Sequence, residues 1–315
     1  MSIVRIPGRI ALLTAALATA MVGVVAPTAA AQADPPTLAG AWAPLNRCPV
    51  DDPAMLAADG VEVVAACLSS TSASGSITIG ATTLTTGGND LQAGVLNRGG
   101  TYTLVAPDGG AVVGDPVQIP GGLLGLMCPS DIPFISDICE RVENSPLNRV
   151  TATIEAAGTP SDFNLAAGLG IGQSIVTLPV KIQLDNPFLG SNCHIGSDDD
   201  PILLRPANLS RPTGGVVRFN PDGTPSPTGE MGYISLRGAD QGDSTFAVPG
   251  ADGCGFLGLL NGAVNLKQGL PSPAGENSLV LNDATTNLGG FQIPRNFAPT
   301  QGEQLSTRWH AAIVG

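Results

Sequence analysis

The sequence predicts an all-β protein of antiparallel, sandwich-like sheets with many Gly and Pro turns, one or two short helices and disulfide bridges. Only 13% of the 315 residues are charged, whereas Gly and Pro account for 41 and 27 residues. Because exposed helices normally depend on Glu and Lys, this composition favours short strands separated by frequent turns. Several segments also alternate apolar and polar residues with the period of a strand, and six cysteines are present.

The first 33 residues are typical of a secretory signal peptide. Arg5 and Arg9 precede an apolar run over residues 10–25, and an Ala-Gln-Ala sequence of the kind found at cleavage sites ends at Ala33. We therefore expect export, cleavage near Ala33, and a secreted or cell-envelope-associated protein. All six cysteines follow this site and would meet an oxidising compartment, in which thiols tend to pair.

After the leader we expect an N-terminal β region over residues 34–110 and a main β region over residues 111–315, with a single domain over both as the alternative. The proposed boundary lies in the Gly- and Pro-rich stretch 107–120. No apolar stretch after residue 33 reaches the roughly 18 residues that are needed to cross a bilayer, so no membrane span is expected there.

Strands are expected in order over 61–68, from Ile77 onward, and over 102–106, 111–119, 150–156, 176–184, 215–219, 233–237 and 278–281. The clearest is 176–184, in which alternate apolar residues would share one face. Pro179 lies on the other face and lacks an amide hydrogen, which predicts an edge strand or a bulge. The Asp-Asn-Pro sequence that starts at Asp185 should end the strand.

Two segments could form short helices. Residues 136–144 contain Cys139, and residues 255–265 contain closely spaced leucines. Neither segment is long. We expect a strand at the C-terminal end, where Trp309 and His310 lie.

Six cysteines allow 15 pairings, and the sequence alone does not select one. We favour pairing in sequential order: Cys48 with Cys67, Cys128 with Cys139, and Cys193 with Cys254. In the chain-entropy view each bridge would stabilise the fold by roughly 3 to 4 kcal/mol. The third would connect the strand ending near residue 184 to the Gly-rich segment around residue 254.

One segment resembles a family. Residues 181–197, followed by Asp-Pro-Ile from Asp200, have the form Lys-Ile-x-Leu-x-Asn-Pro-x-Leu-Gly-x-x-Cys-x-Ile-Gly-Ser, which is similar to uncharacterised secreted proteins of actinobacteria. Residues 248–255 and 269–275 resemble a second block of the same proteins. The resemblance implies an exported or envelope protein and supports Cys193 and Cys254 as partners. It implies no activity.

The charge balance argues against several partners. The chain has 14 basic and 26 acidic residues, and the leader would remove two arginines but no acid. Such a surface repels nucleic acid and anionic lipid, so neither is expected as a partner. A cell-wall or protein partner stays open, as does the oligomeric state.

Motifs for hydrolysis are incomplete. Ser174 follows a Gly-x spacing but lacks the second glycine of a nucleophile elbow, and Ser244 in Gly-Asp-Ser lacks an Asp three residues before the late histidine. His194 and His310 are the only imidazoles and are expected to have structural roles. Two isolated histidines do not make a zinc site. We therefore expect no catalytic residues and no enzyme activity.

A weak metal candidate is the acidic loop of Asp198, Asp199 and Asp200. Oxygen-rich loops can bind extracellular calcium. Adjacent side chains of an extended chain point in alternate directions, however, so a solvated acidic turn is the simpler interpretation. No other cofactor is expected.

These observations favour a secreted, non-catalytic structural or binding protein of the cell envelope or the extracellular space, with an unknown ligand. One alternative is a secreted hydrolase acting on cell-wall or environmental polymer. Another is a carbohydrate- or small-ligand-binding module. A cleft that brings a histidine within hydrogen-bond reach of a Ser and an acid would favour the enzyme.

Overall fold

The computed structural model of the protein describes residues 35–127, 145–293 and 299–314. The expected leader, residues 1–33, lies outside the described residues. Residues 34–315 form one compact unit. The strands are β1 (Val63–Ser72), β2 (Ser74–Ile79), β3 (Thr82–Thr86), β4 (Asn89–Arg98), β5 (Thr101–Val105), β6 (Val112–Gly114), β7 (Val117–Gln118), β8 (Thr151–Ala156), β9 (Leu178–Asp185), β10 (His194–Ile195), β11 (Ile202–Leu204), β12 (Ala207–Asn208), β13 (Thr213–Phe219), β14 (Met231–Asp243), β15 (Ala251–Asp252) and β16 (Ser278–Gln292).

The predicted fold class is confirmed: the described strands join in a 16-stranded sheet whose main path runs β12-β14-β16-β1-β4-β6-β8-β9-β10-β15. Neighbours along this path pair antiparallel. Every strand range expected from the sequence overlaps an observed strand. The pairing of β4 with β6, Asn89 opposite Gly114, crosses the expected boundary at residue 110.

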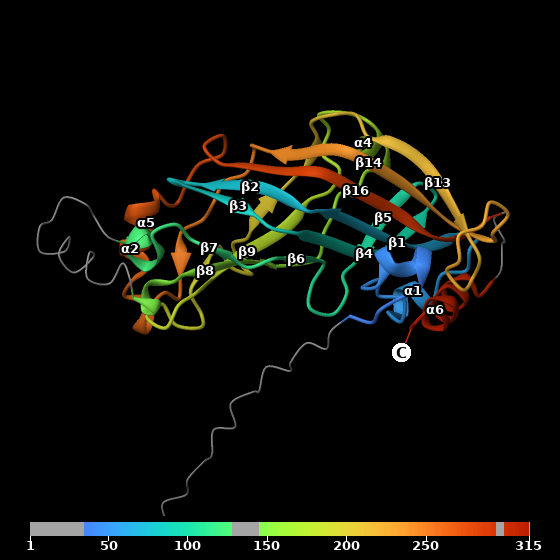
Figure 1. Ribbon diagram of the computed structural model, residues 1–315, viewed down its shortest axis with the longest axis horizontal. Helices are drawn as coiled ribbons and strands as arrows, with labels where there is room; N and C mark the ends of the chain where they lie inside the picture. Colours follow the sequence, from blue (N-terminus) through green and yellow to red (C-terminus); the bar gives the residue numbers. More distant parts are fainter. Residues whose placement is uncertain (1–34, 128–144, 294–298, 315) are drawn as a thin grey trace, which may run out of the picture. The chain divides into compact units, whose positions relative to one another are not determined.

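The sheet closes on itself through one short segment of chain. β11 pairs with β9, and only two residues later β12 pairs with β14 at the far end of the main path. Ala207 lies between Gly242 of β14 and Ser174, which precedes β9, and bridges to both. The result is two facing layers that belong to one sheet: β14, β16 and β2 form one layer in Figure 1, and β6 to β9 form the other.

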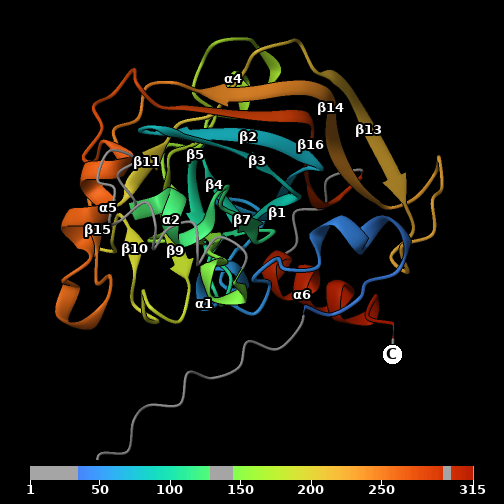
Figure 2. The same ribbon diagram turned by 60° about the vertical axis from the view of Figure 1, so that its left-hand side comes forward.

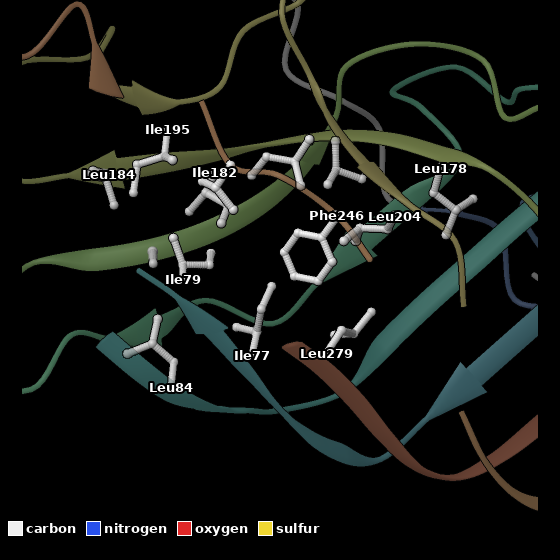
Figure 3. Close-up of a cluster of buried hydrophobic side chains, with 14 of the residues drawn as sticks. Ile77, Ile79, Leu84, Leu178, Ile182, Leu184, Ile195, Leu204, Phe246 and Leu279 are labelled. Atoms are coloured by element: carbon white, nitrogen blue, oxygen red, sulfur yellow. The ribbon is translucent and has the colours of Figure 1, made fainter. Parts of the chain in front are cut away.

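Apolar side chains from both layers fill the interior. This inner core includes Ala66, Leu68, Ile77, Ile79, Leu84, Ala93, Val95, Leu104, Leu178, Val180, Ile182, Leu184, Ile202, Leu204, Phe246, Leu279 and Leu288. Figure 3 shows the side chains of β2, β3 and β16 facing those of β9 and β11, with Phe246 between them. Close packing of this interior is the main source of stability expected for the fold.

A second core covers the outer face of the sheet at one end. This outer core comprises Leu38, Ala41, Trp42, Leu45, Cys48, Val50, Met55, Ala58, Ala65, Cys67, Phe219, Met231, Tyr233, Leu305, Trp309 and Ala312. Because side chains of a strand alternate between faces, β1 contributes Ala66 and Leu68 to the inner core and Ala65 and Cys67 to the outer core. Strand β1 is therefore buried on both sides.

More short helices are present than the one or two expected. The helical segments are η1 (Gly40–Leu45), α1 (Pro53–Leu56), α2 (Gly122–Met127), η2 (Pro146–Asn148), α4 (Leu165–Leu169), η3 (Phe256–Gly258), α5 (Asn261–Gln268) and α6 (Gln301–Ala311). The expected helix over 255–265 corresponds to η3 and α5, which lies beside α2 in Figures 1 and 2. The helix expected over 136–144 lies outside the described residues. Among the described residues, no helix has the length and apolarity to cross a bilayer.

The expected C-terminal strand was wrong, because Trp309 and His310 lie on the helix α6. Leu305, Trp309 and Ala312 are all buried. Their spacings of four and three residues place them on one helical face, which packs into the outer core. The spacing of these three apolar residues matches the period of a helix and not that of a strand, so it predicts the observed structure.

Strand β9 has the predicted alternation but is not an edge strand. Residues 178, 180, 182 and 184 are buried, with less buried residues between them. The strand pairs with β8 on one side and with β10 and β11 on the other. The missing amide hydrogen of Pro179 is tolerated because this residue lies opposite the chain just beyond the end of β8, where the ladder requires no further bond. At this point the Pro179 carbonyl accepts from the Ala157 amide.

Two of the predicted disulfides are present, Cys48–Cys67 and Cys193–Cys254. The predicted Cys128–Cys139 pair lies outside the described residues. Among the described cysteines none is free. The second bridge lies beside the short strands β10 and β15, which are paired with each other, and the Cys193 carbonyl also accepts from the Leu184 amide of β9.

Candidate functional site

The two histidines occupy separate sites, and each has a carboxylate partner. His310 Nε2 lies 2.8 and 2.9 Å from the two carboxylate oxygens of Asp51. Ser306, one turn earlier on α6, donates to Asp51 Oδ1 at 2.7 Å. The hydroxyl proton therefore points to the carboxylate and not to the imidazole, which is the reverse of the order needed to activate a serine. The cluster joins α6 to the segment before α1.

The environment of Asp51 favours its charged form. Partial burial raises the pKa of this carboxyl group, but the hydrogen bonds from Ser306 and His310 and the charge of His310 lower it, and the net pKa lies below the ordinary value. The lowered pKa keeps the carboxylate charged, and able to hold both partners, to somewhat below its ordinary value of 3.8. This arrangement supports docking of α6.

His194 makes no comparable cluster. Its Nδ1 lies 2.9 Å from the Asn192 carbonyl oxygen, and its Nε2 lies 3.9 Å from Glu155 Oε2. No serine hydroxyl bonds to it in the described residues. The contacts tie the β10 residue to the end of β8, next to the Cys193 bridge.

The two serines considered as nucleophiles lie near one another but away from both histidines. Ser174 and Ser244 line an open hollow of about 450 Å³ together with Asp243. The buried Asp243 carboxylate accepts from the Arg205 amide and from both the amide and the hydroxyl of Thr245. Three of its roughly four acceptor positions are therefore used by local groups, and within the described residues Ser244 donates no hydrogen bond to it.

The three acids of the calcium candidate lie on an exposed turn. Asp198 Oδ1 accepts from Lys181 Nζ at 2.8 Å, and the Asp200 amide donates to Ser197 Oγ. No group of three His, Cys, Asp or Glu residues in the described ranges is arranged to hold a metal ion. Lys181 already neutralises part of the negative charge that would attract a calcium ion to this turn.

The strongest candidate site is a cavity of about 250 Å³ at one end of the closed sheet. Larger hollows elsewhere are more open to solvent. The lining is mainly apolar and contains no acidic or basic side chain. It consists of Gly60, Val64, Ala66, Val95, Asn97, Tyr102, Leu165, Leu288, Phe291, Gln292 and Gln301.

Strand parity explains why these side chains meet. Val64 and Ala66 share the inward face of β1, and Ala66, Val95 of β4 and Leu288 of β16 belong to the inner core. The cavity is therefore a continuation of the inner core that is incompletely filled. Ala66 contributes to the empty space, because a small side chain lies where most inward positions hold Leu, Ile or Val.

A bulge in β16 brings Phe291 into the lining. Tyr233 of β14 pairs with Gly289, but the next residue, Gly232, pairs with Phe291, so Gly290 is the extra residue. Gly290 has φ +85°, a conformation that favours glycine. In a regular strand Phe291 would lie on the same face as Gly289, which is the outer face. The inserted residue shifts the alternation by one position, so that Phe291 lines the cavity instead.

Two polar groups in the lining are available to a ligand. Asn97 Oδ1 accepts from the Gly100 amide, but Asn97 Nδ2 makes no hydrogen bond to another described residue, and neither does the Tyr102 hydroxyl. The ring of Tyr102 is fixed by an edge-to-face contact with Phe163, with centroids 5.4 Å apart. Both groups can donate to an acceptor on an otherwise apolar molecule.

Comparison with known proteins adds no relative: no family model, curated protein or solved structure matches this chain. The cavity was not predicted from the sequence. Two features of the sequence point to the cavity lining: Val64 and Ala66 alternate with the period of a strand, and a Gly-Gly pair before Phe291 marks a bulge inside a strand.

Proposed function

We propose that this is an exported, non-catalytic binding protein that holds a small, uncharged, apolar ligand in the cavity between β1, β4, β5 and β16. The observation that carries the proposal is the lining: apolar side chains with two hydrogen-bond donors, Asn97 and Tyr102, and no charged group. Ligand sites in proteins typically combine an apolar surface with a few polar groups, and they occur at the open ends of closed sheets.

The volume limits the size of the ligand. An apolar cavity of about 150 Å³ accepts benzene, so a cavity of about 250 Å³ has room for a larger group. An alkyl chain of moderate length or a two-ring compound would fit. A ligand with a carbonyl or ester oxygen would also accept a hydrogen bond from Tyr102 or Asn97. A carboxylate ligand would lose its hydration without gaining an ion pair with a basic side chain.

Export is part of the proposal. It is supported by the leader-like first 33 residues and by the two disulfides of the compact unit, which are characteristic of oxidising compartments. Secretion into the medium and retention in the envelope are both compatible with these features.

The test is a titration with the uncharged two-ring fluorescent probe 1-naphthylamine, followed by displacement with methyl decanoate. The lining variant Val64→Phe should weaken probe binding at least tenfold, because the added ring occupies the cavity. The matched control Val61→Phe adds the same ring at a side chain that is 61% exposed and outside the lining, and it should leave affinity within about twofold. Absence of probe binding, or equal binding by both variants, would overturn the proposal.

A further inference from the structure

A second apolar feature lies at η3 and α5, away from the cavity. The side chains of Phe256, Leu257, Leu259 and Leu266 are 80%, 85%, 76% and 87% exposed. We call these four residues the apolar tip. Single exposed apolar residues are common, but four large ones within eleven residues indicate an interaction surface.

The tip is held rigidly at its base. Cys254 is fully buried in the bridge to Cys193, and the Gly255 amide donates to the Leu189 carbonyl at 2.7 Å. Asn261 Oδ1 accepts from the Cys254 amide, and Asn261 Nδ2 donates to Asp252. The exposure of the four side chains is therefore a property of an ordered segment.

The backbone at Leu257 is a second, independent sign of function. Leu257 has φ 53° and ψ 29°, the left-handed region that leucine rarely adopts. Gly255 and Gly258 also have positive φ. This conformation presents the Leu257 side chain to solvent and gains no burial in return, and such strain is characteristic of binding sites.

The charge of the segment that carries the tip favours an uncharged partner surface. Residues 253–275 contain no acid and one lysine, Lys267, in a chain with 26 acidic residues. The acid that precedes this stretch in the sequence, Asp252, accepts from Asn261. The segment that carries the tip thus adds no acid of its own, unlike most of the chain, and a bilayer requires no shape complementarity from the protruding side chains.

We infer that the apolar tip inserts into the surface of an uncharged or zwitterionic lipid bilayer and attaches the folded protein peripherally. This attachment does not depend on the cavity ligand, because the tip and the cavity share no residue. Failure of one proposal therefore leaves the other standing. The acidic remainder of the chain should make anionic bilayers poorer partners.

The test is flotation of the disulfide-bonded unit, residues 34–315, with phosphatidylcholine vesicles. The tip variant Phe256→Ser with Leu257→Ser should reduce the bound fraction at least tenfold. The matched control, Leu209→Ser with Val216→Ser, removes two apolar side chains that are 54% and 61% exposed elsewhere, and it should float like the wild type.

Leu257→Gly separates binding from folding, because glycine accepts the positive φ. This variant should be at least as stable as the wild type and should still bind vesicles less. The inference is overturned if the wild type does not float, if the control loses binding equally, or if anionic vesicles bind more protein at low salt. It is also overturned if sedimentation without vesicles shows a dimer that the tip variant dissociates.

Discussion

The side chain of Gln301 pairs with both backbone polar groups of Ala65. Gln301 Oε1 accepts from the Ala65 amide at 2.8 Å, and Gln301 Nε2 donates to the Ala65 carbonyl at 2.9 Å. The pairing of β1 with β16 begins at Cys67, so the side-chain amide of Gln301 takes the place of a neighbouring strand at Ala65. Gln301 also lines the cavity and is the first residue of α6.

Replacing Gln301 by Ala should destabilise the protein by about 2 kcal/mol, because two backbone groups lose their partners. Urea denaturation measures the free energy of unfolding. Gln304→Ala is the control, since the side chain of Gln304 bonds to the side chains of Gln292 and Thr300 and to no backbone group of a strand, and it should change stability by less than about 0.5 kcal/mol. Equal effects of the two substitutions would contradict the assigned role of Gln301.

Gly290→Ala should destabilise the protein by about 1 to 3 kcal/mol and weaken probe binding in the cavity. The new Cβ would lie 2.7 Å from Leu305 Cδ1, and the positive φ would be strained. The control Gly262→Ala lies in α5 with open space around its Cβ position, and it should be neutral or stabilise by up to about 1 kcal/mol. Unchanged probe affinity in a folded Gly290→Ala protein would show that the bulge does not position Phe291.

The two described disulfides should differ in their contributions. Their cysteines are separated by 19 and 61 residues, so the chain-entropy relation gives about 3 kcal/mol for Cys48–Cys67 and about 4 kcal/mol for Cys193–Cys254. Paired Cys→Ala variants, compared by chemical denaturation, test this order. A larger loss from the shorter loop would show that packing, and not loop length, determines the effect.

Asp51 should contribute to acid sensitivity. Its folded-state pKa is lowered, so the stabilisation is fully present above the ordinary value of 3.8 and is lost as the pH falls through the folded pKa. The free energy of unfolding of the wild type should therefore decrease below about pH 4 more steeply than that of Asp51→Asn. Asp199→Asn, which changes an exposed acid on the 198–200 turn, should retain the wild-type slope. Parallel profiles for wild type and Asp51→Asn would contradict the assigned interaction.

Local patterns predicted the strands well, because alternation in segments such as 176–184 directly reflects burial on one face. The segment around Trp309 and His310 was expected to be a strand, whereas the spacing of Trp309 from Leu305 is helical. Local sequence patterns could not predict that the sheet closes, because closure depends on the pairing of β11 and β12 with strands that are distant in the sequence. The cavity depends on the same closure, so its lining could not be assembled from sequence motifs.

The most direct test of the central claim is amide and methyl NMR of the disulfide-bonded unit during titration with methyl decanoate. Binding in the cavity should produce saturable shifts concentrated at Val64, Tyr102, Leu288 and Phe291, and these shifts should be lost in Val64→Phe. A fully folded protein whose cavity resonances do not respond, or respond identically in Val64→Phe, would contradict the claim that this cavity binds a small apolar ligand.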